Sequence, residues 1–297
     1  MSEISHSETE ILLRAFPKGV IAVDLETTGL SPLLDRIIEL SAVKVTKDGI
    51  ETFDQLINPG INIPQNTIDI HGITDEMVAT SPKIEDVLPR FREFAGDLPF
   101  IAHNAKFDAG FIVYAAHHLN TAWQNNDVFC SCRFARLTLK DMPNYKLGTL
   151  SEELDITLEN HHRALDDAWA SLHIYIKGLG AQGEKMDAQI GKLFNLSEFS
   201  KNKDLSIPTK LAGIVKMVEE QRVLLIRYKG GSMRGQLRPI KAIALLPLPA
   251  GNILYAHCLK TNLFKSYSLN KIIEFREVEG KEAREFIKEA KTIRPKQ

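Results

Sequence analysis

The first half of the chain is organised around one stretch, Val20-Ile21-Ala22-Val23-Asp24-Leu25-Glu26-Thr27-Thr28-Gly29. It opens with four apolar residues, three of them β-branched, which predicts a buried strand. Side chains alternate along a strand, so Asp24 and Glu26 project from the same face. Neighbouring carboxylates repel each other, and burial makes each one harder to ionise. A divalent cation that prefers oxygen ligands, Mg²⁺ or Mn²⁺, would resolve this conflict.

An isolated Asp-x-Glu is more often a pair of solvated acids at the end of a strand. Whether Asp24 and Glu26 form a metal site therefore depends on what the rest of the chain places beside them.

Composition limits the class of protein. The chain has 297 residues, of which 44% are hydrophobic and 25% are charged, as in soluble globular proteins with one or two domains. No apolar run approaches the ~20 residues of a membrane helix, and residues 1–10 are polar, so we expect neither a membrane span nor a signal peptide. Three cysteines, Cys130, Cys132 and Cys258, make a disulfide framework improbable and predict a cytoplasmic location.

Charge divides the chain into an acidic part and a basic part. Residues 206–297 contain 18 Lys and Arg against 8 Asp and Glu, which gives a net charge of +10. The preceding residues contain 19 basic and 30 acidic side chains, which gives −11. This split predicts two domains, and the basic one would attract a polyanion.

Apolar runs and turn residues predict three antiparallel strands first: the stretch quoted above, residues 36–45 and residues 50–57. Asp48-Gly49 lies between the last two and marks a hairpin turn. Further strands then alternate with helices. The strands are predicted at 98–102 and 128–129, and the helices at 8–16, 85–94, 107–119, 132–139, 147–154 and 164–177. This order predicts an α/β domain over residues 1–180, with a mixed sheet flanked by helices.

The remainder of the chain has a different pattern. Residues 181–205 are polar and are predicted to be a linker, and residues 208–220 resemble an amphipathic helix with a proline in its first turn. Five short apolar segments follow, at 223–229, 236–246, 253–259, 264–269 and 272–278, and then a helix at 281–292. Strands of this length and spacing predict a small β-barrel or a strongly curved sheet over residues 206–297.

Two more places in the first domain carry acidic residues near the ends of regular elements. Asp108 follows the strand at 98–102 at a junction with a helix, although it could also be a first-turn residue favoured by the helix dipole. His162 immediately precedes the helix at 164–177, and Asp167 lies about one turn inside it. His162 and Asp167 can therefore face one point in front of that helix.

Together these segments resemble the three motifs of the DEDD exonuclease superfamily, in its His-containing, proofreading-exonuclease-like subtype with a ribonuclease H-like fold. The motifs are Asp24-x-Glu26-Thr27-x-Gly29, His103-Asn104-x-x-Phe107-Asp108 and His162-x-Ala164-x-x-Asp167-Ala168. They occur in the family's order and spacing, and the resemblance covers roughly residues 18–178. The spacing selects His162 over its neighbour His161 and Asp167 over Asp166. Neighbours on a helix point about 100° apart, so both aspartates cannot serve equally.

The resemblance implies a set of roles. Four carboxylates would hold two Mg²⁺ or Mn²⁺ ions ~4 Å apart, with Asp24 bridging them: Asp24, Glu26, Asp108 and Asp167. His162 would be the general base, since the ordinary pKa of histidine, ~6.5, lies near working pH. The terminal nucleotide would contact Thr27, Leu30 and His103. The reaction is hydrolysis of nucleic acid from a free 3′ end to nucleoside 5′-monophosphates, with single-stranded DNA favoured as substrate.

The basic domain resembles a WYL domain, an Sm-like small β-barrel of bacterial regulators that is thought to bind nucleic acid or nucleotide-like ligands. Four segments carry this likeness: 223–228, Arg238-Pro239, 253–258 and 265–272. Ile253-Leu254-Tyr255 replaces the family's naming tripeptide, and Lys265 and Lys271 stand where arginine is frequent. Lysine keeps the charge but lacks the planar fork of arginine.

Cationic residues of this domain could form one face for a nucleic-acid backbone, or simply a solvated surface: Lys229, Arg234, Arg238, Lys260, Lys265 and Lys271. Tyr228, Tyr255 and Tyr267 could stack on bases or fill the barrel core.

The sequence thus predicts a two-domain, metal-dependent 3′–5′ exonuclease with a basic domain that holds or regulates nucleic acid. Two alternatives stay open: a nucleic-acid or nucleotide-sensing regulator that uses the nuclease fold as a scaffold, and an RNA-trimming exoribonuclease. The sequence names no polymerase or repair partner.

Overall fold

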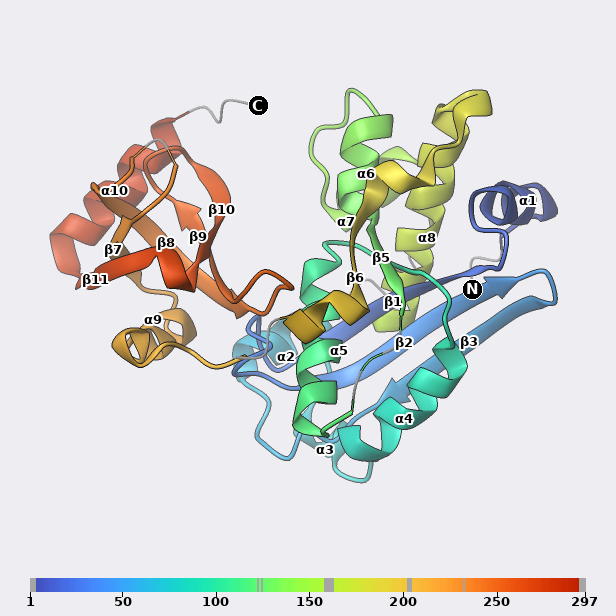
Figure 1. The fold of residues 1–297 in the computed structure, drawn as a ribbon, viewed down its shortest axis with the longest axis horizontal. Helices are drawn as coiled ribbons and strands as arrows, with labels where there is room; N and C mark the ends of the chain where they lie inside the picture. The colour runs from blue at the N-terminus through green and yellow to red at the C-terminus, as the bar shows by residue number, and fades with distance from the viewer. Residues whose placement is uncertain are drawn as a thin grey trace. The chain divides into compact units, whose positions relative to one another are not determined.

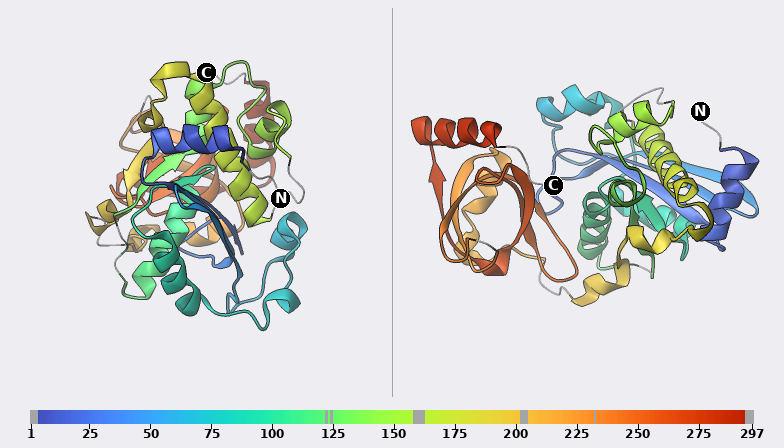
Figure 2. Two further views of the ribbon diagram at one scale, coloured as in Figure 1. Left: turned by 90° about the vertical axis from the view of Figure 1, so that its right-hand side faces the viewer. Right: turned by 90° about the horizontal axis from the view of Figure 1, so that it is seen from above.

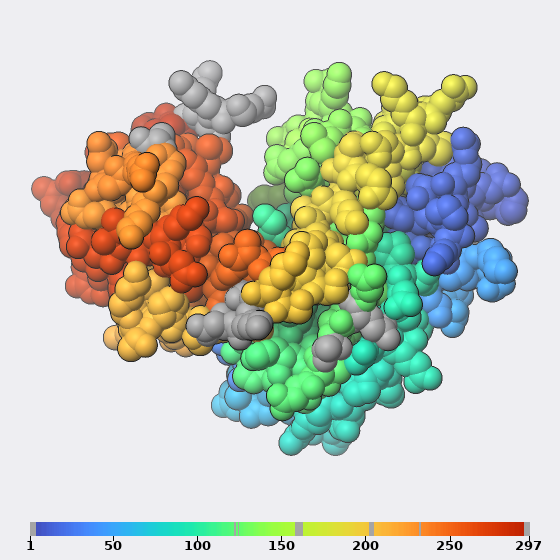
Figure 3. Space-filling model, in the orientation of Figure 1, coloured from blue at the N-terminus to red at the C-terminus, as the bar shows by residue number. Residues whose placement is uncertain are grey.

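The computed structural model describes residues 4–121, 123, 125–157, 163–201, 205–231 and 233–293 (Figure 1). The chain forms two compact units. The N-terminal unit comprises Met1–Gly29 and Asp35–Glu198, and the C-terminal unit comprises Leu30–Leu34 and Phe199–Gln297. Figure 3 shows the same chain in space-filling form with the same colours. No helix among the described residues is long and apolar enough to cross a membrane.

The N-terminal unit is built on a six-stranded sheet in the order β3-β2-β1-β4-β5-β6. The strands are β1 (Val20–Thr27), β2 (Ile37–Thr46), β3 (Gly49–Leu56), β4 (Phe100–Ala102), β5 (Asp127–Cys130) and β6 (Lys192–Asn195). β1, β4 and β5 run parallel, while β2, β3 and β6 are antiparallel to their neighbours. The predicted mixed α/β sheet is confirmed. Gly49, in the predicted hairpin turn, has a φ of 134° that disfavours any side chain.

Helices cover both faces of this sheet (Figure 2). They are α1 (His6–Ala15), α2 (Gln65–His71), α3 (Asp75–Val78), α4 (Ile84–Ala95), α5 (Lys106–His118), α6 (Ser131–Thr138), α7 (Leu147–Glu153) and α8 (Ala164–Ala181). On one face α8 packs against β1 and β2, with α1, α6 and α7 beside it. On the other face α5 contacts β1, and α4 contacts both β3 and α5.

The alternation along β1 explains where the acidic residues emerge. Val20 and Ala22 are fully buried in the core between the sheet and α8, where they join Ala168 and Leu172. Asp24 and Glu26 continue the same face of the strand towards its end. The packing that fixes β1 against α8 therefore also fixes the two carboxylates near the start of that helix.

The N-terminal unit differs from the sequence-based expectation in two elements. Residues 65–71, for which the sequence pattern predicted no helix, form α2 between Pro64 at its N-cap and Gly72, whose φ of 72° ends it. Those two residues are ordinary helix boundary signals. The stretch predicted to be a linker contains β6, which pairs antiparallel with β5 at the edge of the sheet. β6 has only four residues, two of them polar and two apolar, which is too short for a periodicity of its own, so the strand depends on its partner.

The C-terminal unit is a five-stranded antiparallel sheet in the order β10-β9-β8-β7-β11. Its strands are β7 (Val223–Tyr228), β8 (Leu237–Leu246), β9 (Ile253–Cys258), β10 (Leu263–Ser268) and β11 (Ile272–Val278). All five predicted strands are confirmed. Within the described ranges no pairing joins β10 to β11, so closure into a barrel stays a prediction.

Other parts of this unit complete its core. α10 (Gly280–Thr292) packs Phe286 and Ile287 against a cluster that includes Val223 and Val278. The helix predicted at 208–220 is divided into a 3₁₀ turn, Thr209–Leu211, and α9 (Ile214–Glu219). In the segment Leu30–Leu34, the hydroxyl of Ser31 accepts a 3.0 Å hydrogen bond from the backbone N–H of Leu245 in β8.

Two side chains assigned to possible nucleic-acid contacts are buried instead. Arg238 exposes 4% of its surface and Tyr267 exposes 2%. The Arg238 guanidinium lies 5.5 Å from the centre of the Tyr267 ring. The prediction that Arg238 belongs to a cationic surface is therefore wrong: its side chain is held against an aromatic ring inside the unit.

Candidate active site

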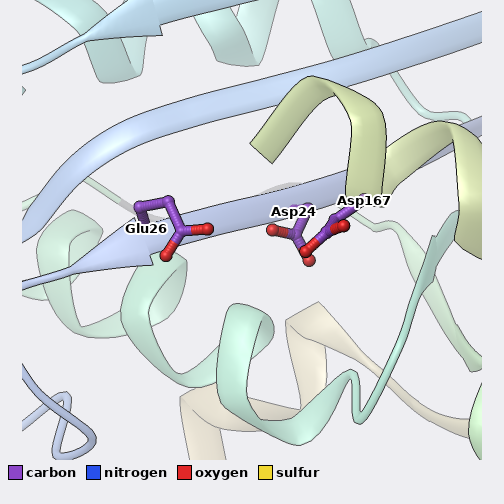
Figure 4. Close-up of side chains that lie close together, drawn as sticks. All are labelled: Asp24, Glu26 and Asp167. Carbon is purple, nitrogen blue, oxygen red and sulfur yellow. The ribbon is translucent and has the colours of Figure 1, made fainter. Parts of the chain in front are cut away.

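Three carboxylates from two distant parts of the sequence meet at one place. Asp24 and Glu26 project from β1, and Asp167 comes from the first turn of α8. One ligand oxygen of each lies within 4.8 Å of the others. In Figure 4 the carboxylates of Asp24 and Asp167 lie side by side, with Glu26 further along β1. The structure thus brings together three of the four acids that the motifs predicted as metal ligands.

Asp108, the fourth predicted ligand, lies in the first turn of α5 and exposes only 3% of its surface. It is outside the group of three, but its charge raises the pKa of Asp24. Burial raises the pKa of Asp108 itself to about 8, although the backbone N–H groups of Asp108 and Leu25 oppose the shift. Its Oδ2 is buried without a hydrogen-bond partner. A buried acceptor of this kind needs a proton or a cation.

Burial and mutual repulsion make the carboxylates of β1 weak acids. The pKa of Asp24 is raised well above its ordinary value by burial, then by the charges of Asp108 and Asp167. Burial, followed by the charges of Asp167 and Glu39, raises the pKa of Glu26 to about 8, and Arg163 opposes this shift. An all-oxygen site with this much negative charge fits a hard divalent cation.

A buried ion pair, which the sequence analysis missed, fixes the start of α8. Glu39 in β2 stands opposite Glu26 in β1 and is 1% exposed. It accepts hydrogen bonds from Arg163 Nη2 at 2.6 Å, from Arg163 Nε at 3.1 Å and from the backbone N–H of Ala164 at 3.0 Å. These bonds tie β2 to the first residue of the helix that carries Asp167. A glutamate inside the apolar run Ile37-Ile38-Glu39-Leu40 was the available signal, because such a residue is buried only with a partner.

The predicted substrate contacts have different surroundings. Thr27 is 7% exposed, and its hydroxyl donates a 2.6 Å hydrogen bond to the carbonyl of Gly29, which orders the turn after β1. Leu30 begins the short segment that belongs to the C-terminal unit and exposes 45% of its surface. Their contacts with a nucleotide stay predictions.

His103 is held by protein groups at both ring nitrogens. Nε2 lies 3.0 Å from the Tyr145 carbonyl and Nδ1 lies 2.8 Å from the Ser131 hydroxyl. A carbonyl only accepts, so Nε2 carries the proton and Nδ1 accepts from Ser131. Burial lowers the pKa of His103 to about 4. The ring is therefore neutral. Because both nitrogens are already bonded, the predicted contact with a nucleotide, which stays a prediction, would have to use the carbon atoms of the ring.

The predicted general base, His162, lies outside the described residues, together with the other residues of 158–162. The described chain resumes at Arg163, whose guanidinium is bound to Glu39.

Residues 21–175 match the model of a protein family described as Exonuclease, which is just over half of the chain. The chain belongs to this exonuclease family. It is 42% identical over 160 residues to the PolC-type DNA polymerase III of Caldanaerobacter subterraneus subsp. tengcongensis, a match that covers 54% of this chain and 11% of the relative. It is 36% identical over 221 residues to the PolC-type DNA polymerase III of Clostridium perfringens, covering 74% of this chain and 15% of the relative.

The chain therefore spans only a small part of the length of these relatives. Among solved structures, Escherichia coli Exonuclease I in complex with a dT13 oligonucleotide shares the fold, with a TM-score of 0.52 and 17% identity. That match covers 80% of this chain and 55% of the other.

Replacing Asp24 with Asn should stabilise the metal-free exonuclease. A carboxyl group whose pKa is higher in the folded than in the unfolded state makes the protein less stable at high pH. The free energy of unfolding falls as the pH rises from ~4 to the pKa of the folded state, because the folded protein binds more protons over this range. In chelator at pH 9, Asp24→Asn should raise the free energy of unfolding by about 1–3 kcal/mol, or Tm by about 2–4 °C per kcal/mol.

Tryptophan fluorescence can follow this transition, since both tryptophans, Trp123 and Trp169, lie in the N-terminal unit. The exposed Asp97→Asn is the matched control, with no expected change. A lower Tm for Asp24→Asn at pH 9 would contradict the repulsion described here.

Replacing Glu39 with Gln should weaken metal binding without touching a predicted ligand. The amide nitrogen of Gln cannot accept from Arg163 or Ala164, so the start of α8 loses part of its anchor and Asp167 shifts. We expect Mn²⁺ affinity to fall by about 10–100-fold, measured by calorimetric titration at pH 9, above the raised pKa values of Glu26 and Asp108. Glu85→Gln, an exposed change on α4, is the control. Equal Mn²⁺ affinity for Glu39→Gln and wild type would show that the anchor is unnecessary.

Proposed function

We propose that this chain is a metal-dependent 3′–5′ exonuclease of the His-containing subtype, which removes nucleoside 5′-monophosphates from the 3′ end of a DNA strand. The observation that carries the proposal is the meeting of Asp24, Glu26 and Asp167 within 4.8 Å, beside the buried Asp108, in a chain of the exonuclease family. Structural carboxylates are not gathered in this way, because each raises the free-energy cost of ionising the next.

DNA is the substrate that the relatives favour. Both polymerase relatives described above are DNA polymerases by name, and the matched segment is a small part of each. We infer that the chain performs the proofreading type of reaction, removal of nucleotides from a 3′ end, and that a single-stranded 3′ end is its preferred substrate. RNA trimming is the alternative within the same chemistry.

The four carboxylates would hold two Mg²⁺ or Mn²⁺ ions, with Asp24 as the shared ligand. The pKa of Asp24 is raised by burial and then by the charges of Asp108, Asp167 and Glu26, which supports this role. When bound, such a pair of ions makes a water molecule more acidic and stabilises the departing 3′-oxygen. The chain's own contribution is to hold the acids rigidly: Asp24 and Glu26 by the packing of β1, and Asp167 by the bonds from Glu39 to the start of α8.

His162 would accept the proton of the attacking water as general base. The next residue in the chain, Arg163, is bound to Glu39 through its Nε and Nη2 atoms. An ordinary histidine is neutral and able to accept a proton above ~pH 6.5. Thr27, Leu30 and His103 would contact the terminal nucleotide, His103 through its ring carbon atoms.

The C-terminal unit would hold or regulate the nucleic acid. Its antiparallel sheet and net charge of +10 over residues 206–297 support this, and the resemblance to a WYL domain with a closed Sm-like barrel is proposed on the same basis. The rival function, a nucleic-acid or nucleotide-sensing regulator without catalysis, would need the same basic unit but would not require the three clustered acids or the buried Asp108.

A DNA strand labelled at its 5′ end tests the function. Wild type with Mg²⁺ or Mn²⁺ should produce a ladder that shortens from the 3′ end, and chelator should abolish it. Asp167→Asn should lower the rate at least a hundredfold, roughly the loss expected when transition-state charge is no longer stabilised. Asp166→Asn, on the same helix turn but outside the cluster, should stay close to wild type. His162→Ala and His161→Ala form a second matched pair in the same assay.

A matched RNA strand run in parallel decides the substrate, because the 2′-hydroxyl is the feature that separates RNA from DNA. Faster shortening of RNA would favour the exoribonuclease. If neither strand is shortened with either metal, the catalytic proposal fails and the regulator remains.

A further inference from the structure

Three aromatic side chains lie together on the surface of the C-terminal unit: Tyr255, His257 and Phe264, here called the aromatic patch. The ring centre of Phe264 lies 5.0 Å from that of His257 and 5.9 Å from that of Tyr255, and the ring planes are inclined by only 29° and 20°. Phe264 nevertheless exposes 62% of its surface. A phenylalanine this exposed and flanked by stacked rings indicates a surface that another molecule covers.

The strand register places these rings on one face of the sheet (β8–β10 in Figure 1). His257 in β9 stands directly opposite Phe264 in β10 and opposite Lys241 in β8. Tyr255, two residues before His257, projects from the same face. Residues directly opposite on paired strands have neighbouring side chains, so a cation lies next to the aromatic patch.

The flanking rings are held in place by the rest of the unit. His257 Nε2 lies 2.8 Å from Asn262 Oδ1, and Asn262 Nδ2 donates a 2.9 Å bond to the carbonyl of Ile293 at the end of α10. Tyr255 packs against the buried cluster of Ala244, Leu246 and Ile253. Because these side chains are already held in place, stacking of a ligand on them would restrict the protein little further, which favours binding.

The charge around the patch identifies the class of ligand. From Gln221 to Ile273 the chain contains no Asp or Glu but nine Lys and Arg. Arg222 and Arg227 form ion pairs with glutamates outside this stretch. The patch lies on β9 and β10, beside β8; Lys241 in β8 and Lys265 in β10 supply positive charge, and none of these three strands contains a carboxylate. Aromatic rings set among such cations match a polyanion that also offers flat rings, and single-stranded nucleic acid has both.

We propose that the aromatic patch binds single-stranded nucleic acid, with bases stacked against Phe264 and its flanking rings and phosphates near Lys241. The ligand is the strand that the proposed active site shortens, so the identity of the strand rests on the proposed function. Bases in a duplex are stacked on each other and cannot offer a free face, so the patch selects unpaired strands.

Fluorescence anisotropy of a labelled oligothymidylate tests the proposal. The full chain carries Asp167→Asn so that the strand is not cut. In this background Phe264→Ala should weaken binding about tenfold, roughly the contribution of one stacked base, and Phe264→Trp should retain the affinity. Ile273→Ala, which removes another exposed apolar side chain, from β11 (41% exposed), is the matched control and should bind as the background does. Unchanged affinity for Phe264→Ala, or an equal loss on a blunt duplex, would overturn the proposal.

A second measurement separates this proposal from the proposed function. The p-nitrophenyl ester of thymidine 5′-monophosphate is too small to reach beyond an active site, and Phe264→Ala in the otherwise unchanged chain should hydrolyse it at the wild-type rate. If Phe264→Ala lost as much activity on the ester as on a long strand, the substitution would have a general structural effect and the proposal for the aromatic patch would be overturned. If wild type hydrolyses neither the ester nor a long strand, the proposed function fails. The anisotropy measurements would still show whether the aromatic patch binds single-stranded nucleic acid.

Discussion

Repulsion between buried carboxylates is the constraint around which the N-terminal unit is built. Asp24, Glu26 and Asp167 lie within 4.8 Å of one another, and burial makes the charge of each harder to accommodate. Such an arrangement persists only because elements with large apolar contacts hold it. Val20 and Ala22 continue the strand that carries the acids into the core, and α8 packs over them. The site thus lowers stability locally while the surrounding core keeps the fold intact, as expected where function requires strain.

The buried ion pair of Glu39 and Arg163 affects the acidic cluster in two ways. Glu39 contributes negative charge that raises the pKa of Glu26, and it also holds the start of the helix that supplies Asp167. One buried side chain therefore sets both the position and the charge of the cluster. The C-terminal unit has the opposite chemistry. Its strands β8 to β10 combine cations with stacked aromatic rings and contain no acidic residue. The proposed catalysis and the proposed strand binding would therefore use residues of opposite charge.

Local pattern was sufficient for much of this structure. The alternation in β1 predicted that Asp24 and Glu26 share a face, and the motif spacing of the exonuclease resemblance selected Asp167 over Asp166. The structure places Asp24, Glu26 and Asp167 together. What failed depended on partners distant in sequence: β6 is a strand because β5 pairs with it, and Glu39 matters because Arg163 reaches it from 124 residues away. Arg238 resembled a surface cation, but its side chain is buried against Tyr267. Sequence periodicity reports the face that a residue occupies, whereas partners across the fold determine its role.

If the acidic cluster is a metal site, cations replace protons when they bind there. The most direct measurement is calorimetric titration of Mn²⁺ into the chain, in buffers of different ionisation enthalpy and at several pH values. With Glu26 and Asp108 each having a pKa raised to about 8, binding at pH 7 should release protons, and affinity should increase up to about pH 8 and then level off. Binding without proton release, at an affinity independent of pH, would contradict the account.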